Sequence, residues 1–266
     1  MTPDVTTATR AYLTLVDDQA PGLVDGFYLV GSLALGDYRP GQSDIDFVAR
    51  MAAEPTPEQI AALGRVHAEL STPMPFDGVY VTADDLLGDP TRSADRPHAY
   101  EGRFEVGDSF EVNPAVWQTL AQSPVVLRGG LPQVSADRTR LDGWTRDNLR
   151  DYWLPLRSEI AGADPSRVVD ALVVWVALGV TRLYYTLVTG LVTAKSGAGE
   201  WASGEVGPRP ILREALRLRA GDGSGYTSLA ERRQDLLDYL SEILTRAGQV
   251  DPPEVSGTAG HRPAGC

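Results

Sequence analysis

Hydrophobic and polar positions divide the chain into a first half of alternating strands and helices and a second half that is helical throughout. In the first half, short apolar runs predict strands at residues 27–30, 44–48, 74–82 and 124–128. Apolar residues three and four positions apart predict helices at 6–18, 57–70 and 113–121, a short helix at 82–88 and one helical turn at 33–35. Residues 89–112 show no such period, so we expect a loop-rich insertion that either serves the site or covers it.

The second half has helical periodicity from residue 137 onward. We expect helices at 141–159, with a kink at Pro155, at 165–190 as the longest, and at 210–220 and 228–247. Glycine and proline at 129–132 predict a linker between the halves. The pattern therefore predicts an α+β protein with a mixed-sheet domain at 1–133, an all-α helical-bundle domain at 134–248 and a disordered tail at 249–266.

Composition narrows the class of protein. The 266 residues, 42% apolar and 23% charged, suffice for two modest globular domains. No uncharged apolar run is long enough to span a bilayer and the amino terminus is unlike a signal peptide, so we expect a cytoplasmic protein without membrane contact, and a monomer. The net charge of -12 argues against binding nucleic acid and favours cationic ligands. The single cysteine, Cys266, excludes an intrachain disulfide.

The stretch with the clearest chemistry is residues 27–50, FYLVGSLALGDYRPGQSDIDFVAR. Asp44 and Asp46 lie two residues apart in a predicted strand, so their carboxylates point to the same face. Two carboxylates on one face repel each other unless a cation lies between them, and Mg²⁺ is the natural cation for oxygen ligands. Both residues are therefore candidate metal ligands.

Gly31 and Ser32 interrupt the apolar run upstream of the two acids. Glycine lets the backbone approach a ligand closely, and the amide groups of a short turn together with the serine hydroxyl suit an anion such as phosphate. The alternative is an ordinary Gly-Ser turn before a polar strand. The order of the parts on a strand, a turn and a strand favours the phosphate site.

Asp77 is the third acid in the argument. If its strand lies beside the strand of Asp44 and Asp46, its carboxylate reaches the same cavity and serves as a general base or as a third metal ligand. The alternative is an Asp-Gly turn that bends an edge strand. The histidines share no metal-ligand spacing with the acids.

The Gly31-Ser32 and Asp44-Ile45-Asp46 motifs resemble the signature of the nucleotidyltransferase superfamily. That resemblance implies a small mixed-sheet catalytic domain that transfers a nucleoside monophosphate from a nucleoside triphosphate. The signature does not identify the acceptor.

Residues 176–202 are similar to the helical carboxy-terminal domain of the streptomycin/spectinomycin adenylyltransferases. The resemblance implies that Arg182, on a helix, and Lys195, beyond a Thr-Gly turn, contact the nucleotide phosphates. Lys195 is the only lysine of the chain. The alternative is that both are solvated surface charges. The resemblance also aligns Asp77 with the catalytic base of the family, a glutamate one methylene longer.

The acceptor site departs from the family pattern. Members of the family carry a tryptophan and two acids before the arginine helix and an asparagine on it, and here the asparagine position holds Trp175. No acid falls in the expected register. The residues that follow are therefore no more than candidates for contact with the acceptor: Phe104, Trp153, Glu159, Asp164, Asp170 and Trp175. Each is equally suited to a core, cap or surface role.

Together the residues and the resemblance imply an Mg²⁺-dependent enzyme that uses ATP as co-substrate and transfers AMP to a hydroxyl of a small cationic acceptor. An aminoglycoside or aminocyclitol antibiotic is the expected acceptor, and its modification would confer resistance. Two alternatives remain open: the same chemistry on another small molecule, such as a biosynthetic intermediate, and a nucleotide-binding protein without catalysis.

Overall fold

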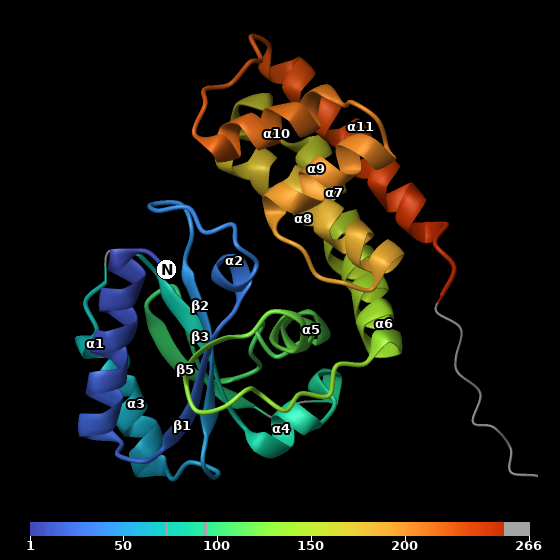
Figure 1. Cartoon of the computed structure of the whole chain (residues 1–266). Coiled ribbons are helices and arrows are strands. Elements are labelled where there is room, and N and C mark those ends of the chain that lie inside the picture. The colour runs from blue at the N-terminus through green and yellow to red at the C-terminus, as the bar shows by residue number, and fades with distance from the viewer. Residues whose placement is uncertain (73, 93–94, 253–266) are drawn as a thin grey trace, which may run out of the picture.

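The chain forms two lobes, shown in Figure 1. The structure is a computed structural model and describes residues 1–72, 74–92 and 95–252. The sheet lobe holds all six strands and the helices up to α5, and the helical lobe holds α6 to α11. This arrangement confirms the predicted α+β class, with a mixed sheet followed by a helical region.

The sheet has the strand order β5-β4-β3-β2-β1-β6. Only the β2 and β3 pair is parallel, and the other pairs are antiparallel. The strands are β1 (Val24–Leu29), β2 (Ile45–Met51), β3 (Phe76–Thr82), β4 (Arg96–Tyr100), β5 (Arg103–Gly107) and β6 (Val125–Arg128).

Helices cover both faces of the sheet. Helices α1 (Pro3–Gln19) and α3 (Pro57–Glu69) pack on one face, against a core that includes Phe27, Phe47 and Tyr80. The other face packs against α4 (Ala83–Leu87) and α5 (Pro114–Gln122) through Val48 and Val79. Because strand side chains alternate, Asp46 and Asp77 belong to the α5 face.

Residues 89–112 differ from the loop-rich insertion that the pattern suggested. A 3₁₀ turn, η1 (Pro90–Arg92), is followed by the β4–β5 hairpin, whose turn residues Glu101 and Gly102 have φ angles of 48° and 74°. Two left-handed residues match the right-handed strand twist in a two-residue hairpin. The edge strand of the sheet is β5, where charged side chains are tolerated. Pro97 lies in β4 outside the two residue pairs, Gly78–Ala99 and Val79–His98, that join β4 to β3, so its missing amide breaks no bond there. These residues hide the apolar alternation.

The helical lobe is built around α8 (Asp170–Thr189), which contacts α9, α10 and α11. Its apolar residues are buried among those helices, and the helix ends at Gly190 in the left-handed conformation. The other helices are α6 (Arg138–Asn148), α7 (Leu154–Gly162), α9 (Lys195–Glu205), α10 (Pro210–Ala220) and α11 (Leu229–Gly248).

Helix α8 is also long and apolar enough to cross a membrane by length and composition, with a mean hydropathy of 1.7. The helix begins at Asp170 and contains Arg182, so it holds no uncharged apolar run of that length, as the sequence analysis states. Its central place in the helical core accounts for the composition, since a helix that packs on several sides is apolar on several sides.

Two local predictions in this lobe also differ from the structure. The expected helix at 141–159 is interrupted by a π-helical segment, η2 (Leu149–Trp153), immediately before Pro155, which lies in the first turn of α7 where no amide is needed. The long helix begins at Asp170, after a 3₁₀ turn, η3 (Pro165–Arg167), and α11 equals it in length. Of the predicted tail, residues 253–266, including Cys266, lie outside the described part.

Candidate active site

The parallel pairing of β2 with β3 places Asp46 directly beside Asp77. Asp44 precedes β2 by one residue and shares the face of Asp46. Gly78, which the alternative interpretation assigned to a turn, lies within β3 opposite Phe47, where a Cβ would come within 2.2 Å of the Phe47 carbonyl oxygen. Asp77-Gly78 is therefore interior strand, and the three acids converge as the sequence predicted.

Gly31 and Ser32 open the one-turn helix α2 (Gly31–Ala34), and α2 contacts β2. A Cβ at Gly31 would lie 1.9 Å from Oδ2 of Asp46, and Gly31 has a φ of 56°. Only glycine allows the turn to approach the carboxylate so closely. The buried Ser32 hydroxyl has no partner among the described residues, which leaves it available to a ligand.

The acids hold their protons more tightly than isolated carboxylates do. Burial, followed by the charge of Asp44, raises the pKa of Asp77 to about 7. Burial, followed by the same charge, raises the pKa of Asp46 to about 6, and burial also raises the pKa of Asp44. The backbone amide of Glu101 donates to Asp77 Oδ1 at 3.1 Å and partly offsets the shift there. A carboxyl with a pKa near neutrality suits a general base.

The helical lobe contributes positive charge to the same place. Arg182 on α8 and Lys195, the first residue of α9, are both half-buried and act electrostatically on Asp46. Burial lowers the pKa of Lys195, and the neighbouring charges of Arg182 and Arg219 lower it further. The residues predicted to contact phosphates from the second lobe therefore face the acids of the first.

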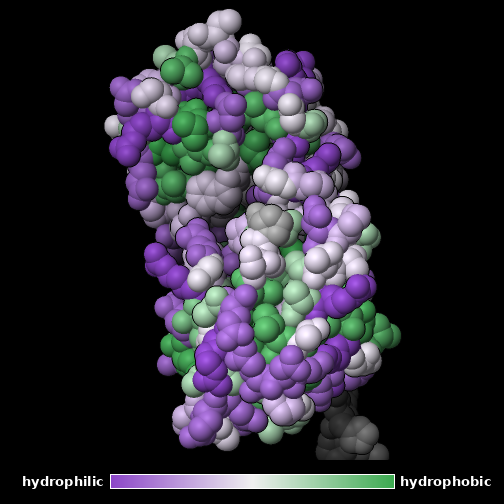
Figure 2. Space-filling view, turned by 90° about the vertical axis from the view of Figure 1, so that its left-hand side faces the viewer, coloured by the Kyte–Doolittle hydropathy of each residue, from purple (hydrophilic) through white to green (hydrophobic). Residues whose placement is uncertain are grey.

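A loop at residues 190–194 carries Lys195 into position. The Arg182 side chain donates from Nε to the Thr193 carbonyl oxygen at 2.9 Å. Gln122, at the end of α5, donates to the Val192 carbonyl at 2.9 Å and accepts from the Val192 amide at 3.1 Å. The loop is thus bonded to α8 of the helical lobe and to α5 of the sheet lobe. Figure 2 shows a hollow in the surface between the two lobes.

The donor set fits a magnesium ion that is shared with a polyphosphate. In the described part of the chain, no three His, Cys, Asp or Glu side chains are arranged to hold a metal ion by themselves. Mg²⁺ is usually held by one or two carboxylates together with substrate phosphates. Burial raises the pKa of all three acids, and the charge of Asp44 raises the pKa of Asp46 and Asp77 further, so a cation beside them would relieve this repulsion.

The candidate acceptor residues are dispersed. Phe104 lies on the opposite face of the sheet from the acids and packs on His67 and Tyr80, with ring centroids 5.5 and 6.2 Å away. Glu159 and Asp164 are exposed, Asp164 caps η3 through the Ser166 amide, and Asp170 pairs with Arg232 at 2.5 Å. These contacts give Phe104, Asp164 and Asp170 structural roles, because a core ring, a helix cap and an ion pair account for them.

Trp153 and Trp175 do come together, with ring centroids 5.3 Å apart. The Trp153 ring also packs on Gly179 of α8, and its indole nitrogen donates to Asn148 at 3.0 Å. Trp175, Gly179 and Arg182 follow one another at helical spacing along one side of α8. The two tryptophans therefore extend, on the helical lobe, the side of α8 that carries Arg182.

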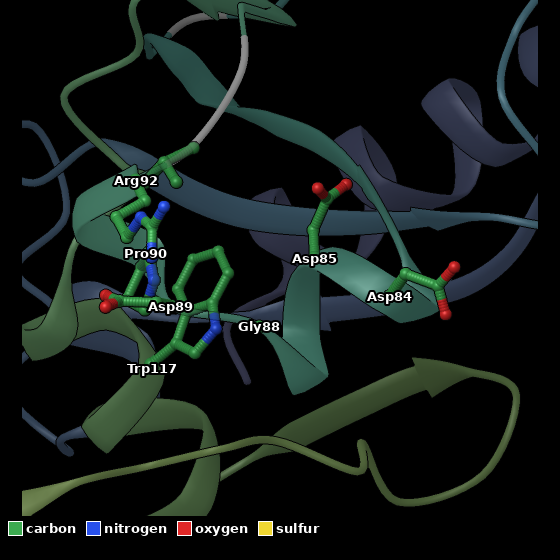
Figure 3. A pocket seen from close by; sticks show the side chains of 8 residues that line it. Asp84, Asp85, Gly88, Asp89, Pro90, Arg92 and Trp117 are labelled. Atoms are coloured by element: carbon green, nitrogen blue, oxygen red, sulfur yellow. The ribbon is translucent and has the colours of Figure 1, made fainter.

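A separate cavity of about 430 Å³ lies between α4, η1 and α5 (Figure 3), and its lining residues do not include the three acids. Two of the acids that line it are already engaged: Asp85 caps α4 and pairs with Arg96, and Asp89 pairs with Arg140 at 3.3 Å. The cavity is not part of the site formed by Asp44, Asp46 and Asp77.

Several residues that shape the site were not identified from the sequence. Glu101 and Glu111 add negative charge beside the acids, and Asp37 bonds to Arg219 across the lobes. Helix α9 was also missed, because three glycines in its eleven residues disguise it. Asp37 lies within the 27–50 stretch, but its partner is 182 residues away, so no local pattern marks it.

Comparisons with known proteins agree with this geometry. Residues 11–77 match the model of the "Nucleotidyltransferase domain" family. No curated protein sequence matches the chain. The crystal structure of the spectinomycin adenyltransferase from Enterococcus faecialis with ATP and spectinomycin has the same fold, with a TM-score of 0.63 and 14% identity over 91% of this chain and 99% of that one. Residues 11–77 therefore match a nucleotidyltransferase domain, within a two-lobed fold that resembles the spectinomycin adenyltransferase.

Proposed function

We propose that the protein transfers AMP from ATP to a hydroxyl group of a small cationic acceptor, in an Mg²⁺-dependent reaction. The observation that carries the proposal is the register of β2 and β3, which sets Asp46 beside Asp77 while Gly31 lies against the Asp46 carboxylate. The candidate metal ligand Asp46, the candidate base Asp77 and the candidate phosphate turn at Gly31 therefore lie next to one another. The nucleotidyltransferase domain at residues 11–77 supports the reaction class.

Each residue has a distinct part in this mechanism. Gly31 and Ser32 bind the triphosphate through backbone amides and the Ser32 hydroxyl, and Arg182 and Lys195 contact it from the helical lobe. Asp77 accepts the proton of the acceptor hydroxyl as its oxygen forms a bond to the α-phosphorus, and the bond to pyrophosphate breaks. Asp44 and Asp46 would hold Mg²⁺, which would neutralise negative charge on the phosphates.

The charge around the site supports a cationic acceptor. Glu101 and Glu111 add negative charge beside the acids, and the chain has a net charge of -12. An aminoglycoside or aminocyclitol has the matching positive charge and several hydroxyls. The structural relative was crystallised with ATP and spectinomycin, a further reason to test this class first. Because ATP is an intracellular co-substrate, we place the activity in the cytoplasm, and transfer to a drug would confer resistance.

A second candidate has the same chemistry with a different acceptor. Two of the acids considered for contact with the drug are otherwise engaged, since Asp164 caps a helix and Asp170 forms an ion pair. A biosynthetic intermediate with a hydroxyl group would then replace the antibiotic.

The test is pyrophosphate release with ATP, Mg²⁺ and a panel of aminoglycosides and aminocyclitols. Release that depends on a drug supports the first candidate. Release with no drug but with another hydroxylated amine supports the second, and ATP binding without release with any acceptor would leave a non-catalytic protein. The variant Asp44→Asn tests the metal assignment, which would be wrong if full turnover remained.

A further inference from the structure

A buried ion pair joins the two lobes beside the candidate site. Arg219, in the last turn of α10, donates to Asp37 Oδ2 from Nε at 2.9 Å and from Nη2 at 2.7 Å, and to the Asp37 carbonyl oxygen at 3.0 Å. Asp37 and Arg219 are 7% and 6% exposed. An ion pair held this far from water requires several hydrogen bonds to offset its desolvation, and those bonds are present here.

The same carboxylate completes the amino terminus of α9. The N-cap residue of α9, Ala194, has no side-chain acceptor, and Asp37 accepts from the Ser196 amide at 3.1 Å and the Ser196 hydroxyl at 2.8 Å. A helix in one lobe is therefore capped by an acid of the other. Lys195 immediately precedes Ser196, so the cap also fixes the backbone that carries the Lys195 ammonium.

Asp37 is bonded to the phosphate turn as well. Its backbone amide donates to the Ser32 carbonyl oxygen at 2.9 Å. A continuous path of hydrogen bonds thus runs from Ser32, through Asp37, to Ser196 and Arg219. The two halves of the proposed phosphate site, one in each lobe, are held at a fixed separation by this path.

We propose that Asp37, Ser196 and Arg219 form an interlobe latch that positions Lys195 over the phosphate turn and holds the lobes in the nucleotide-binding arrangement. The latch residues are positioning residues, since they act through Lys195 and Ser32. This inference rests on the proposed function, because it assigns Lys195 to the nucleotide. Breaking the latch should weaken ATP binding even where the fold survives.

The experiment compares Asp37→Asn and Arg219→Lys with a matched control. Glu214 also lies on α10, is 3% exposed and bonds to Ser224 and Gly225 within the helical lobe, so Glu214→Gln perturbs an equally buried carboxylate that does not cross the lobes. Binding of ATP with Mg²⁺ is measured by calorimetry below the unfolding temperature of each variant. The radius of gyration is measured by small-angle X-ray scattering without nucleotide.

Asp37→Asn is expected to weaken ATP binding about tenfold or more, within the range over which coupled sites influence each other, and to increase the radius of gyration. Arg219→Lys, which retains the buried positive charge, should bind ATP more tightly than Asp37→Asn and more weakly than the wild type. Glu214→Gln should change neither quantity. If Asp37→Asn only lowers the unfolding temperature, and binds ATP and scatters as Glu214→Gln does, the latch is refuted.

Failure of the proposed function gives a different result. A wild-type protein that binds ATP but releases no pyrophosphate would refute the transfer reaction and leave the latch testable by affinity. A wild-type protein that binds no ATP would refute both, whatever the scattering shows.

Discussion

Replacing Asp77 by asparagine should lower turnover by about 10² or more and, at the same time, stabilise the fold above neutral pH. Asp77 is 5% exposed, and burial and the charge of Asp44 raise its pKa to about 7. The folded state therefore binds the Asp77 proton more tightly than the unfolded state does. Stability is greatest below the unfolded pKa of 3.8 and falls as the pH rises towards 7, above which the full penalty remains.

The size of the gain follows from the pKa. A rise from 3.8 to about 7 corresponds to at most ~4 kcal/mol, at about 1.4 kcal/mol for each pKa unit. Asparagine still accepts the Glu101 amide, but its own NH₂ group needs a partner, and an unsatisfied donor costs ~2 kcal/mol. The net gain at pH 8 is then ~2 kcal/mol, or an increase in melting temperature of roughly 4–8 °C for a chain of this length.

The assay is thermal unfolding of the wild type and Asp77→Asn in EDTA at pH 5, 6, 7 and 8, with pyrophosphate release measured in parallel. The advantage of the variant should grow with pH, while turnover falls by about 10² or more, as loss of a general base predicts. Mg²⁺ should narrow the difference by stabilising the wild type. A variant that is less stable at pH 8, or a difference that does not change with pH, would refute the electrostatic reasoning.

Three further predictions follow from the same contacts. Gly31→Ala should lose activity by about 10² or more, because its Cβ would meet Asp46 Oδ2. The control is Gly36→Ala, at a φ of 72° with no atom nearby, which should retain turnover and lose only ~1 kcal/mol of stability. Equal losses of activity in the two variants would contradict this prediction. Lys195→Ala should raise the KM for ATP about tenfold or more through loss of a charged phosphate contact. The control in the same kinetic assay is Arg213→Ala, which removes an exposed charge. Burial raises the pKa of Asp37, but the bonds from Ser196 and Arg219 outweigh it and hold that pKa below 3.8. The latch therefore contributes its full stability above the unfolded-state pKa of 3.8 and loses it as the pH falls through the lower folded-state pKa. Urea unfolding should show the difference between wild type and Asp37→Asn shrink as the pH falls below 3.8.

The sequence by itself determined the features that depend on neighbours along the chain. The same-face placement of Asp44 and Asp46 follows from the two-residue period of a strand, and the start of α3 follows from Thr56 and Gln59, which form a capping box. Helices α10 and α11 follow from their strong apolar periodicity and differ from the prediction by one residue or less. The boundary between domains at residue 133 stays a prediction.

Only the tertiary structure decided which distant residues meet. The parallel register that sets Asp77 opposite Asp46, the hairpin that brings the Glu101 amide to Asp77, and the bond between Asp37 and Arg219 all join segments that are separated along the chain. The energies of these three contacts depend on burial and strand pairing in the folded chain. A local pattern of polar and apolar residues therefore cannot predict them. The pattern of apolar and polar residues therefore specified most of the elements, although not the β4–β5 hairpin or α9, whereas long-range packing selected the few side chains that share the site.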